Sequence, residues 1–438
     1  MEEALARSQS LPKPDRSKLL EYPTLSLKER DRRWGLIRKM MEKNDVKALI
    51  SIAGGPWDDT SHYLTNFVWP LPGRGAHTVF FPLEGEPVAF GVFHLLYVDV
   101  LLKSEAYGIE SWVKDWRFAQ GRPEDWVDIL KERGLTNCRI GIVGNGQHSR
   151  RIQILIANAL KNAINAALPN VSFVDLWDPF VEIMLVKGQE EIALFRKAAL
   201  ALEVASEEFV NACKPGNTVA DVHTAYMSVL LRYGVDINRT EVSSEPDGGR
   251  GILWCGNGMK PPVIQKGHLV CAELFAYVGA LHSQVQLTVS VGEPTAEKEK
   301  LATLARESYE AGLKILRPGI TFGELCEAMS EPNRREGAWH LSPYAHTLNL
   351  HLGISNITEG IQGPRGFTGV NERLKMKFQE GKEIEASDLV MREGMAIEFE
   401  PNSCYGRTYV NIGGNVLVTK DGCEGLNEIP TRMVVVPA

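Results

Sequence analysis

The chain has 438 residues, of which 44% are hydrophobic and 24% are charged, and its formal net charge is −7. This composition is typical of a folded globular protein, and the length favours two domains over one. The acidic balance argues against a nucleic-acid partner, because nucleic-acid binding requires a basic surface. No apolar run approaches the ~20 residues needed to span a bilayer, so we expect no membrane partner either.

The N-terminal residues, MEEALARSQSLPKPDR, carry acids where a signal peptide needs bases and lack an apolar stretch. They therefore predict a cytoplasmic protein. The whole segment 1–30 is polar and rich in proline, which predicts an arm rather than a core element. Seven cysteines without a CxxC pair indicate reduced thiols rather than disulfide bonds.

Residues 31–180 alternate between strand and helix patterns. RRWGLIRKMMEKN has helical spacing, VKALISI is typical of a strand, and HTVFFPLEGEPVAFGVF is typical of two strands joined at EGEP. NCRIGIVGN adds a further strand, and its glycines do not fit the GxGxxG pattern of a dinucleotide-binding turn. We therefore predict an N-terminal α/β domain over residues 31–180.

A second domain is predicted over residues 188–438. It opens with GQEEIALFRKAALALEVASEEFVNA, an amphipathic helical pattern with acids in its first turn. The stretches KPGNTVADV (214–222) and RPGITFGEL (317–325) share one order of turn, threonine N-cap and helix start. Their repetition within one domain suggests two related halves.

One predicted strand, LVCAELFAYV, contains a single charged residue, Glu273. An unpaired ion in such apolar surroundings costs several kcal/mol, so Glu273 requires a partner. The next stretch, HSQVQLTVSV, alternates polar and apolar residues and predicts an antiparallel neighbour with Gln284 and Gln286 on its polar face. Glu273 is therefore interpreted either as half of a structural pair or as a carboxylate that lines a cleft.

Two further stretches contribute candidate side chains. In MAIEFEPN, Glu398 and Glu400 share one face of a predicted strand. We interpret Glu398 as facing solvent and Glu400 as the better site candidate. In YAHTLNLHLG, the five-residue spacing of His346 and His351 places them on different faces of a helix or strand, so at most one shares a site with the carboxylates.

These segments resemble the creatinase/prolidase/methionine aminopeptidase superfamily, which has the pita-bread fold. GHLVCAELFA resembles its Gly-Asp-x-Val-x-x-Asp strand, AHTLNL its Gly-His-Gly-Ile-Gly-Leu turn, and REGMAIEFEP its Pro-Gly-Met-x-x-x-x-Glu-Pro strand. NIGGNVLVTKDG and VKGQEEIALFRKA resemble two further family segments, in the same order. The resemblance implies an α+β protein of two domains, an N-terminal α/β creatinase-like domain and a C-terminal pita-bread domain with pseudo-twofold symmetry.

In the metallopeptidases of this superfamily five residues hold two divalent ions. The matching positions here are occupied by Glu273, Gln284, His346, Glu400 and Gly413. The two positions that bridge the ions are the neutral Gln284 and the side-chain-free Gly413, so we expect no metal and no other cofactor. A single ion held by Glu273, His346 and Glu400 is the alternative.

Creatinase resembles these peptidases in fold but works without metal, on a guanidinium substrate whose carboxylate is held by arginine. YLTNFVWPLPGR, which ends at Arg74, is similar to the creatinase segment that carries such an arginine. A bidentate arginine suits a small acidic substrate. Two departures from creatinase are that GNGMKPPV lacks its catalytic histidine and that Gln286 replaces a substrate-binding glutamate.

The leading hypothesis is a metal-independent hydrolase of creatinase type that cleaves a C–N bond in a small carboxylate-bearing nitrogen compound. His346 is expected to transfer the proton, and Glu273 and Glu400 to stabilise positive charge and keep His346 protonatable near neutral pH. The expected substrate-binding residues are Arg74, Gln284, Gln286, Tyr405 and Arg407. The resemblance also implies a homodimer in which the N-terminal domain of one subunit lies near the site of the other.

Three alternatives stay open. One is a metal-dependent hydrolase of the Xaa-Pro aminopeptidase or prolidase type, and another is a lyase on the same fold. The third is a catalytically silent binding module, which the eroded ligand set would also fit. An enzyme requires a pocket in which Glu273, His346 and Glu400 converge, whereas a scaffold fills that space with apolar side chains.

Overall fold

The computed structural model describes residues 4–51, 60–67, 77–91, 101–106, 108–117, 122–143, 150–236, 240–248, 254, 258–279, 281–348 and 387–438. Two residues named above, Arg74 and His351, lie outside these ranges. Among the described helices none combines the length and the apolar composition needed to cross a membrane.

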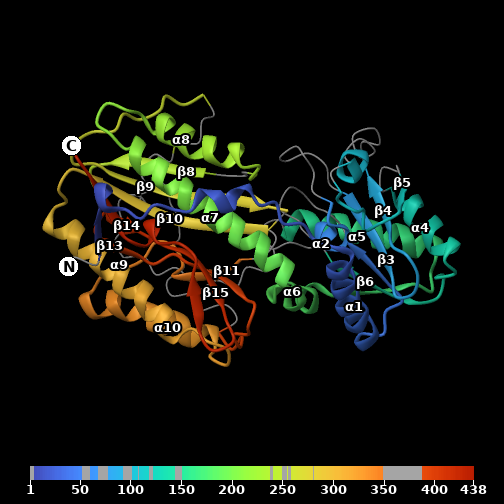
Figure 1. The fold of residues 1–438 in the computed structure, drawn as a ribbon. Helices are drawn as coiled ribbons and strands as arrows, with labels where there is room; N and C mark the ends of the chain where they lie inside the picture. The colour runs from blue at the N-terminus through green and yellow to red at the C-terminus, as the bar shows by residue number, and fades with distance from the viewer. Residues whose placement is uncertain are drawn as a thin grey trace.

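The described part of the N-terminal region forms a six-stranded sheet in the order β5-β4-β3-β2-β6-β7, seen on the right of Figure 1. Its strands are β2 (Ala48–Ser51), β3 (His77–Pro82), β4 (Val88–Gly91), β5 (Asp115–Arg117), β6 (Arg139–Val143) and β7 (Ser172–Asp175). Its helices are α1 (Leu27–Lys43), α2 (Thr60–Thr65), α4 (Pro123–Glu132), α5 (Arg150–Ala167) and α6 (Trp177–Leu185). The predicted hairpin at EGEP is confirmed by the antiparallel pair β3 and β4.

The C-terminal region contains three sheets in its described part. The largest has the order β1-β17-β10-β9-β8, the second has the order β11-β12-β15-β16, and β13 and β14 form the third. The strands of the first are β1 (Leu5–Arg7), β8 (Thr240–Glu245), β9 (Leu269–Val278), β10 (Leu281–Val291) and β17 (Met433–Val436). Those of the others are β11 (Ala345–Thr347), β12 (Ala396–Phe399), β13 (Asn402–Tyr405), β14 (Thr408–Asn411), β15 (Gly414–Val418) and β16 (Cys423–Gly425).

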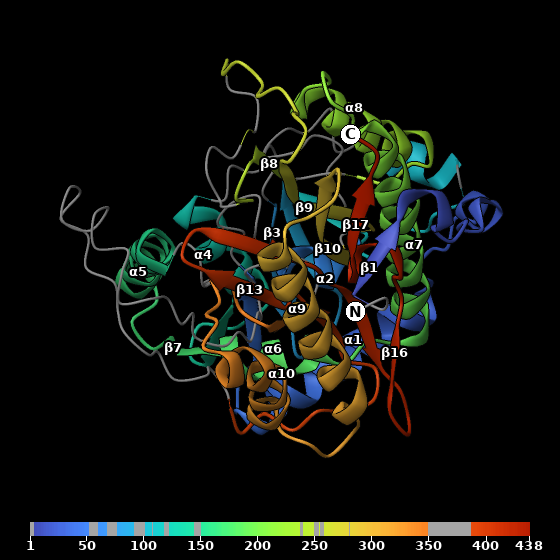
Figure 2. The same ribbon diagram turned by 90° about the vertical axis from the view of Figure 1, so that its left-hand side faces the viewer.

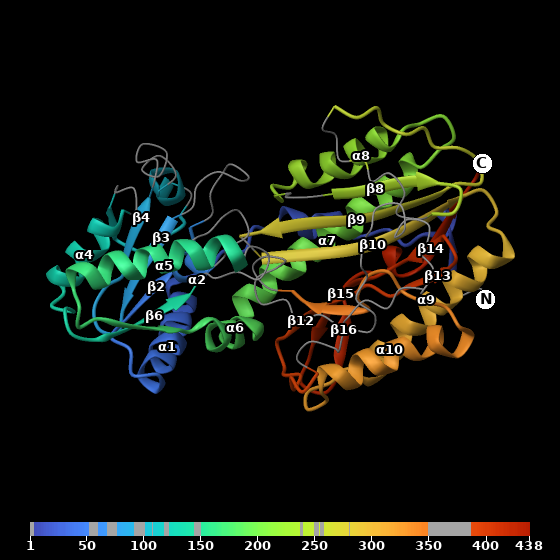
Figure 3. The same ribbon diagram turned by 180° about the vertical axis from the view of Figure 1, so that it is seen from behind.

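Two helix pairs cover these sheets. The pair α7 (Gln189–Ala212) and α8 (Val219–Arg232) packs on β8, β9 and β10, and its apolar side chains form one continuous core with those of the strands. The pair α9 (Ala296–Ile315) and α10 (Phe322–Glu336) packs together, with α9 against β13, β14 and β16. Figures 2 and 3 show the helix pairs on opposite sides of the strands. This arrangement confirms the predicted α+β class with two similar halves.

The two repeated stretches start the second helix of each pair. Thr218 caps α8 by accepting a hydrogen bond from Asp221 N, and Asp221 accepts one from Thr218 N in return. Thr321 and Glu324 form the same reciprocal cap on α10. These capping boxes confirm the local prediction. The domain limits 31–180 and 188–438 stay our proposal.

The N-terminal segment 1–30 takes part in the fold more than predicted. β1 pairs in parallel with the C-terminal strand β17 (Figure 2), and Leu11 and Leu19 are buried in the core beneath α7 and α8. Lys13 and Arg16 form ion pairs with Glu207 on α7. The prediction of an arm outside the core is therefore wrong, because apolar residues scattered among polar ones, such as Leu11 and Leu19, enter the core.

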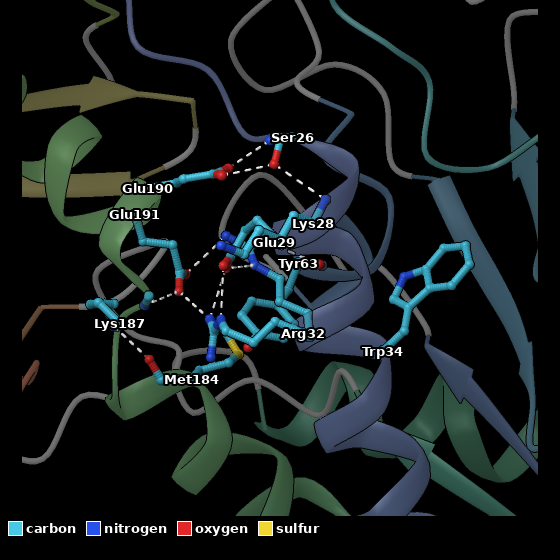
Figure 4. A network of polar contacts seen from close by, with 12 residues as sticks. Ser26, Lys28, Glu29, Arg32, Trp34, Tyr63, Met184, Lys187, Glu190 and Glu191 are labelled. Atoms are coloured by element: carbon cyan, nitrogen blue, oxygen red, sulfur yellow. Dashed lines mark hydrogen bonds and ion pairs between the residues drawn. The ribbon is translucent and has the colours of Figure 1, made fainter.

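A buried ionic network joins α1 to the start of α7 (Figure 4). Arg33 donates to Glu29 and to Glu191, each at 2.9 Å, and Arg32 donates to Glu191 at 2.6 Å. Arg33 also donates to the carbonyl of Tyr63 on α2. Because these charges are both paired and hydrogen-bonded, removing one partner would leave an uncompensated buried charge.

Lys187 lies beside this network and is buried. Its Nζ donates to the carbonyl of Met184, and burial lowers the pKa of Lys187 to about 7. The ordinary pKa of lysine is 10.5, so between about pH 7 and pH 10.5 the Lys187 side chain is protonated in the unfolded chain and neutral in the folded chain. Burial of Lys187 therefore reduces stability at neutral pH, and that loss disappears as the pH rises through this window.

Lys187→Met is expected to remove this pH dependence. The free energy of unfolding of the wild type should rise relative to that of the variant by about 1.4 kcal/mol per pH unit within the window. Denaturant unfolding from about pH 7 to about pH 10 measures it. Lys43→Met, at an exposed position of α1, is the matched control and should run parallel to the wild type. Parallel curves for Lys187→Met would contradict the assignment.

Candidate functional site

The inner faces of the two larger C-terminal sheets meet at Glu400. Gln284 and Gln286, on one face of β10, donate from Nε2 to the same oxygen of Glu400, Oε2, at 3.2 and 2.5 Å. Glu400 directly follows β12, and its backbone N–H donates to the carbonyl of Tyr344 at 2.9 Å. The structure thus brings three predicted site residues into direct contact.

Glu273 lies in the same region on β9. It is directly opposite Gln286 of β10 on one side and Glu241 of β8 on the other. A small pocket beside Glu273 and Glu241 is also lined by Tyr409 and Asn411. Asn411 Nδ2 donates to Gln286 Oε1 at 2.7 Å, so β14 fixes the orientation of that amide. Glu273 therefore lines this small pocket, and its role as a site carboxylate stays a prediction.

His346 lies on β11 and is buried. Its Nδ1 hydrogen-bonds the carbonyl of Thr347 at 3.2 Å, and its Nε2 lies 4.0 Å from Glu400 Oε2. Burial lowers the pKa of His346 to about 4. The expectation that neighbouring glutamates keep this histidine protonatable near neutral pH is therefore wrong: desolvation has the larger effect, and the imidazole is neutral.

Glu398 does not face solvent. It is fully buried, because the face of β12 from which it projects is covered. Its cross-strand neighbours are His346 and Asn415, while Ile397 and Phe399 enter the core on the opposite face. Burial, and then the charges of Glu400 and Glu273, raise the pKa of Glu398 well above the usual range.

Two predicted substrate-binding residues are not brought to this cluster. Tyr405 ends β13 and donates from its hydroxyl to the carbonyl of Glu336 on α10. The side chain of Arg407 is 80% exposed in the turn that follows and lies 3.4 Å from Asp247. Both predictions are corrected, because the hairpin of β13 and β14 directs its tip away from Glu400. Arg74 lies outside the described residues.

The residues at the family's metal positions do not fit a two-metal centre. The amide groups of Gln284 and Gln286 present N–H donors to Glu400, whereas a metal requires oxygen or nitrogen lone pairs. A Cβ on Gly413 would lie 1.9 Å from the carbonyl oxygen of Phe399, so the backbone leaves no room for a ligand there. Within the described ranges no three His, Cys, Asp or Glu side chains are placed to share one ion.

Sequence reasoning missed several residues of the site. Asn411 and Asn415 lie in strands that carry no charge, and Asn415 Oδ1 accepts from the backbone N–H of Gln284 at 3.2 Å. Asn411 is the first residue of NIGG, and only the packing of β14 against β10 brings it to Gln286. The sequence around Glu241 does not alternate polar and apolar residues as a strand would. Only its pairing with Glu273 shows that Glu241 belongs to the site.

The model of metallopeptidase family M24 matches residues 193–420. The probable dipeptidase PepE of Mycobacterium tuberculosis is 25% identical over 264 residues, which are 59% of this chain and 63% of PepE. This chain thus matches less than two thirds of the length of that relative. The Xaa-Pro dipeptidase of Lactobacillus delbrueckii subsp. lactis is 23% identical over 280 residues, covering 63% of this chain and 69% of the relative.

Solved structures share the fold. The dipeptidase PepE of Mycobacterium ulcerans superimposes with a TM-score of 0.69 at 18% identity, over 94% of this chain and 100% of that one. The X-Pro aminopeptidase of Thermotoga maritima gives a TM-score of 0.70 at 18% identity, over 92% and 99%. They confirm the pita-bread fold. Since the family model covers more than half of its length, the chain belongs to metallopeptidase family M24.

Proposed function

We propose that the chain is a hydrolase that cleaves the C–N bond of a small carboxylate-bearing compound, and that this compound is a dipeptide. Membership of family M24 supports hydrolysis of a C–N bond. The relatives named above are dipeptidases and Xaa-Pro dipeptidases, and they favour a peptide bond over the guanidinium substrate of a creatinase-type enzyme. The substrate class thus follows the predicted alternative more closely than the leading hypothesis.

We further propose that this hydrolysis proceeds without a two-metal centre. The observation that carries the proposal is the pair of hydrogen bonds from Gln284 and Gln286 to one oxygen of Glu400. In a metal centre that oxygen would need to present a lone pair to an ion, but here two amide N–H groups use it. Neutral amides also hold Glu400 in place without supplying negative charge for a divalent ion.

His346 and Glu400 are placed to activate water. His346 Nε2 lies 4.0 Å from Glu400 Oε2, so a water molecule hydrogen-bonded to Nε2 would lie beside this carboxylate. Nδ1 donates to the Thr347 carbonyl, so Nε2 carries the lone pair that accepts a proton from the water. The water oxygen then bonds to the carbonyl carbon, the C–N bond breaks, and His346 returns the proton to the leaving nitrogen.

Other groups have supporting roles in this proposal. Glu273 stabilises positive charge that develops on the leaving nitrogen. Arg74 remains the proposed clamp for the substrate carboxylate, and the homodimer remains a proposal drawn from the resemblance. A cytoplasmic location also stays a prediction.

The second candidate is a metal-dependent dipeptidase in which Glu273, His346 and Glu400 hold one ion. The family and the names of the relatives support this candidate more directly than they support a creatinase-type reaction. The two candidates differ in what a chelator does to the enzyme, and a silent binding module differs from both in lacking turnover.

The deciding experiment uses full-length protein purified without chelator. Its metal content is measured by mass spectrometry, and hydrolysis of Ala-Pro and Ala-Ala is followed before and after treatment with EDTA. We expect substoichiometric metal and turnover that survives EDTA within about twofold, since no step uses an ion. Stoichiometric Mn, Fe, Co or Zn whose removal abolishes turnover would establish the second candidate. Absence of turnover on every dipeptide would indicate a silent module.

A further inference from the structure

Glu398 is the buried ionisable group that the proposed mechanism does not use. Its side chain is fully buried, and neither carboxylate oxygen has a hydrogen-bond partner among the described residues. A carboxyl group left in this state costs several kcal/mol relative to the same group in water. A protein that keeps such a residue on a central strand has either a functional reason for it or a ligand that completes it.

The carboxyl group of Glu398 faces the candidate site. It shares the inner face of β12 with Glu400, because residues two apart on a strand point to the same side. His346 and Asn415 flank it on the neighbouring strands. The charges that act on Glu398 come from Glu400 and Glu273, and no cation of the described chain contributes.

A second hydrogen-bond acceptor that lacks a donor in the described chain belongs to Gln284, which contacts both Glu400 and Asn415. Gln284 Oε1 is buried and has no hydrogen-bond partner among the described residues. The same amide is bonded through Nε2 to Glu400, and the backbone N–H of Gln284 donates to Asn415, the cross-strand neighbour of Glu398. Two buried acceptors without donors therefore lie on the faces that meet at Glu400.

We propose that Glu398 and Gln284 Oε1 bind the free ammonium group of the substrate, so that Glu398 determines a specificity for unblocked amines. This inference rests on the proposed function for the identity of the substrate. An ammonium group has three N–H donors and a positive charge, which matches acceptors that lack donors beside several carboxylates. A bound ammonium would also offset the burial and the like charges that act on Glu398.

An ammonium group fits these residues better than a divalent ion. A metal needs three or more ligands converging at about 2.0 to 2.6 Å, and no such group of His, Cys, Asp and Glu side chains exists in the described ranges. Hydrogen bonds to an ammonium tolerate longer distances of about 2.7 to 2.9 Å and a wider range of directions. The cation is therefore assigned to the substrate itself.

The test compares Ala-Pro with N-acetyl-Ala-Pro, in which a neutral acetylated amide replaces the charged amino end and leaves one N–H donor instead of three. Binding by calorimetry and kcat/KM are measured for the wild type and for Glu398→Gln, a substitution of equal size without charge. We expect the variant to bind Ala-Pro roughly ten- to a hundredfold more weakly and to bind the acetylated peptide within about twofold of the wild type. Glu393→Gln, at an exposed position in the turn before β12, is the matched control and should change neither affinity.

Thermal unfolding of the ligand-free proteins gives a readout that is independent of binding. Because Glu398 carries an unpartnered carboxyl group, Glu398→Gln and Glu398→Met are expected to unfold at or above the wild-type Tm. A variant with a lower Tm and equal losses for both peptides would reveal a structural role and overturn the inference. Unchanged binding of Ala-Pro to Glu398→Gln would overturn it as well.

The remaining outcomes separate this inference from the proposed function. If the wild type binds Ala-Pro in preference to the acetylated peptide but cleaves neither, the proposed function fails and the ammonium site stands. If it cleaves both equally, the function stands and the ammonium site fails. If the preference for Ala-Pro disappears in EDTA and returns with Mn²⁺, a metal ion rather than the ammonium group occupies the site and the inference is wrong. If neither peptide binds, both the proposed function and the inference are contradicted.

Discussion

His346→Ala is expected to lower kcat/KM for dipeptide hydrolysis by roughly 10²- to 10⁴-fold, the usual contribution of a positioned general base. The fold should survive, since the ring makes one hydrogen bond to the adjacent carbonyl of Thr347 and the core clusters lie on the other side of β11 and β12. Steady-state kinetics and circular dichroism of the full chain check both statements. His223→Ala, at a half-buried position on α8, is the matched control and should retain activity.

The pH profile of the wild type separates this role from a structural one. The pKa of His346 is about 4, so the neutral form that accepts a proton dominates at all higher pH. We therefore expect kcat/KM to be free of a histidine limb between about pH 5.5 and about pH 8, and to fall only as the pH approaches the pKa. A limb near pH 6.5 that His346→Ala removes would show that the histidine is not neutral, and turnover unchanged by His346→Ala would exclude it from the reaction.

Much of the site framework was predictable because it depends on local pattern. The alternation of polar and apolar residues in β10 places Gln284 and Gln286 on one face, and the antiparallel turn then brings Gln286 opposite Glu273. The threonine caps of α8 and α10 were predictable for the same reason, since a capping box involves only four consecutive residues.

The burial of Glu398 was not predictable from its own strand. A glutamate at every second position is equally typical of a solvated face, and what decides the matter is the packing against that face, which leaves Glu398 fully buried. Tyr405 and Arg407 were misassigned for a related reason. Their distance from Glu400 along the chain is short, but the direction of the hairpin of β13 and β14 is set by packing against α9 and α10.

The protonation of His346 shows a different limit. A histidine among glutamates suggests a raised pKa when only charges are counted, yet the described site is buried deeply enough for desolvation to have the larger effect. The burial of His346 depends on how the sheets and helices pack together, so it could not be predicted from the charged residues expected near it. The same reasoning explains why Lys187, which follows α6 in sequence, has a pKa near 7.

Gly413→Ala is expected to destabilise the protein by more than about 3 kcal/mol, beyond the usual cost of overpacking. The new Cβ would lie 1.9 Å from the carbonyl oxygen of Phe399 and 2.9 Å from Glu400 Cα, and both are backbone atoms that cannot rotate away. Gly413 is also fixed on both sides, since its N–H donates to the Pro430 carbonyl and its carbonyl accepts from Gln286 N. Denaturant unfolding measures the loss.

Gly35→Ala is the matched control for this prediction. Gly35 lies within α1 with no atom within 4 Å of an added Cβ, so alanine there should stabilise the protein by up to about 1 kcal/mol through helix propensity.

The stability of Gly413→Ala also tests whether a metal ligand fits at this position, because Gly413 matches the position of a bridging ligand in the metallopeptidases. If Gly413→Ala folds as stably as the wild type, the backbone has room for a ligand at this position, and the neutral Gln284 is then the bridging position that still lacks a charged ligand. If it is destabilised as expected, the ligand is excluded by the path of the backbone between Phe399 and Glu400, and a return to that centre would require rebuilding the strand pair itself.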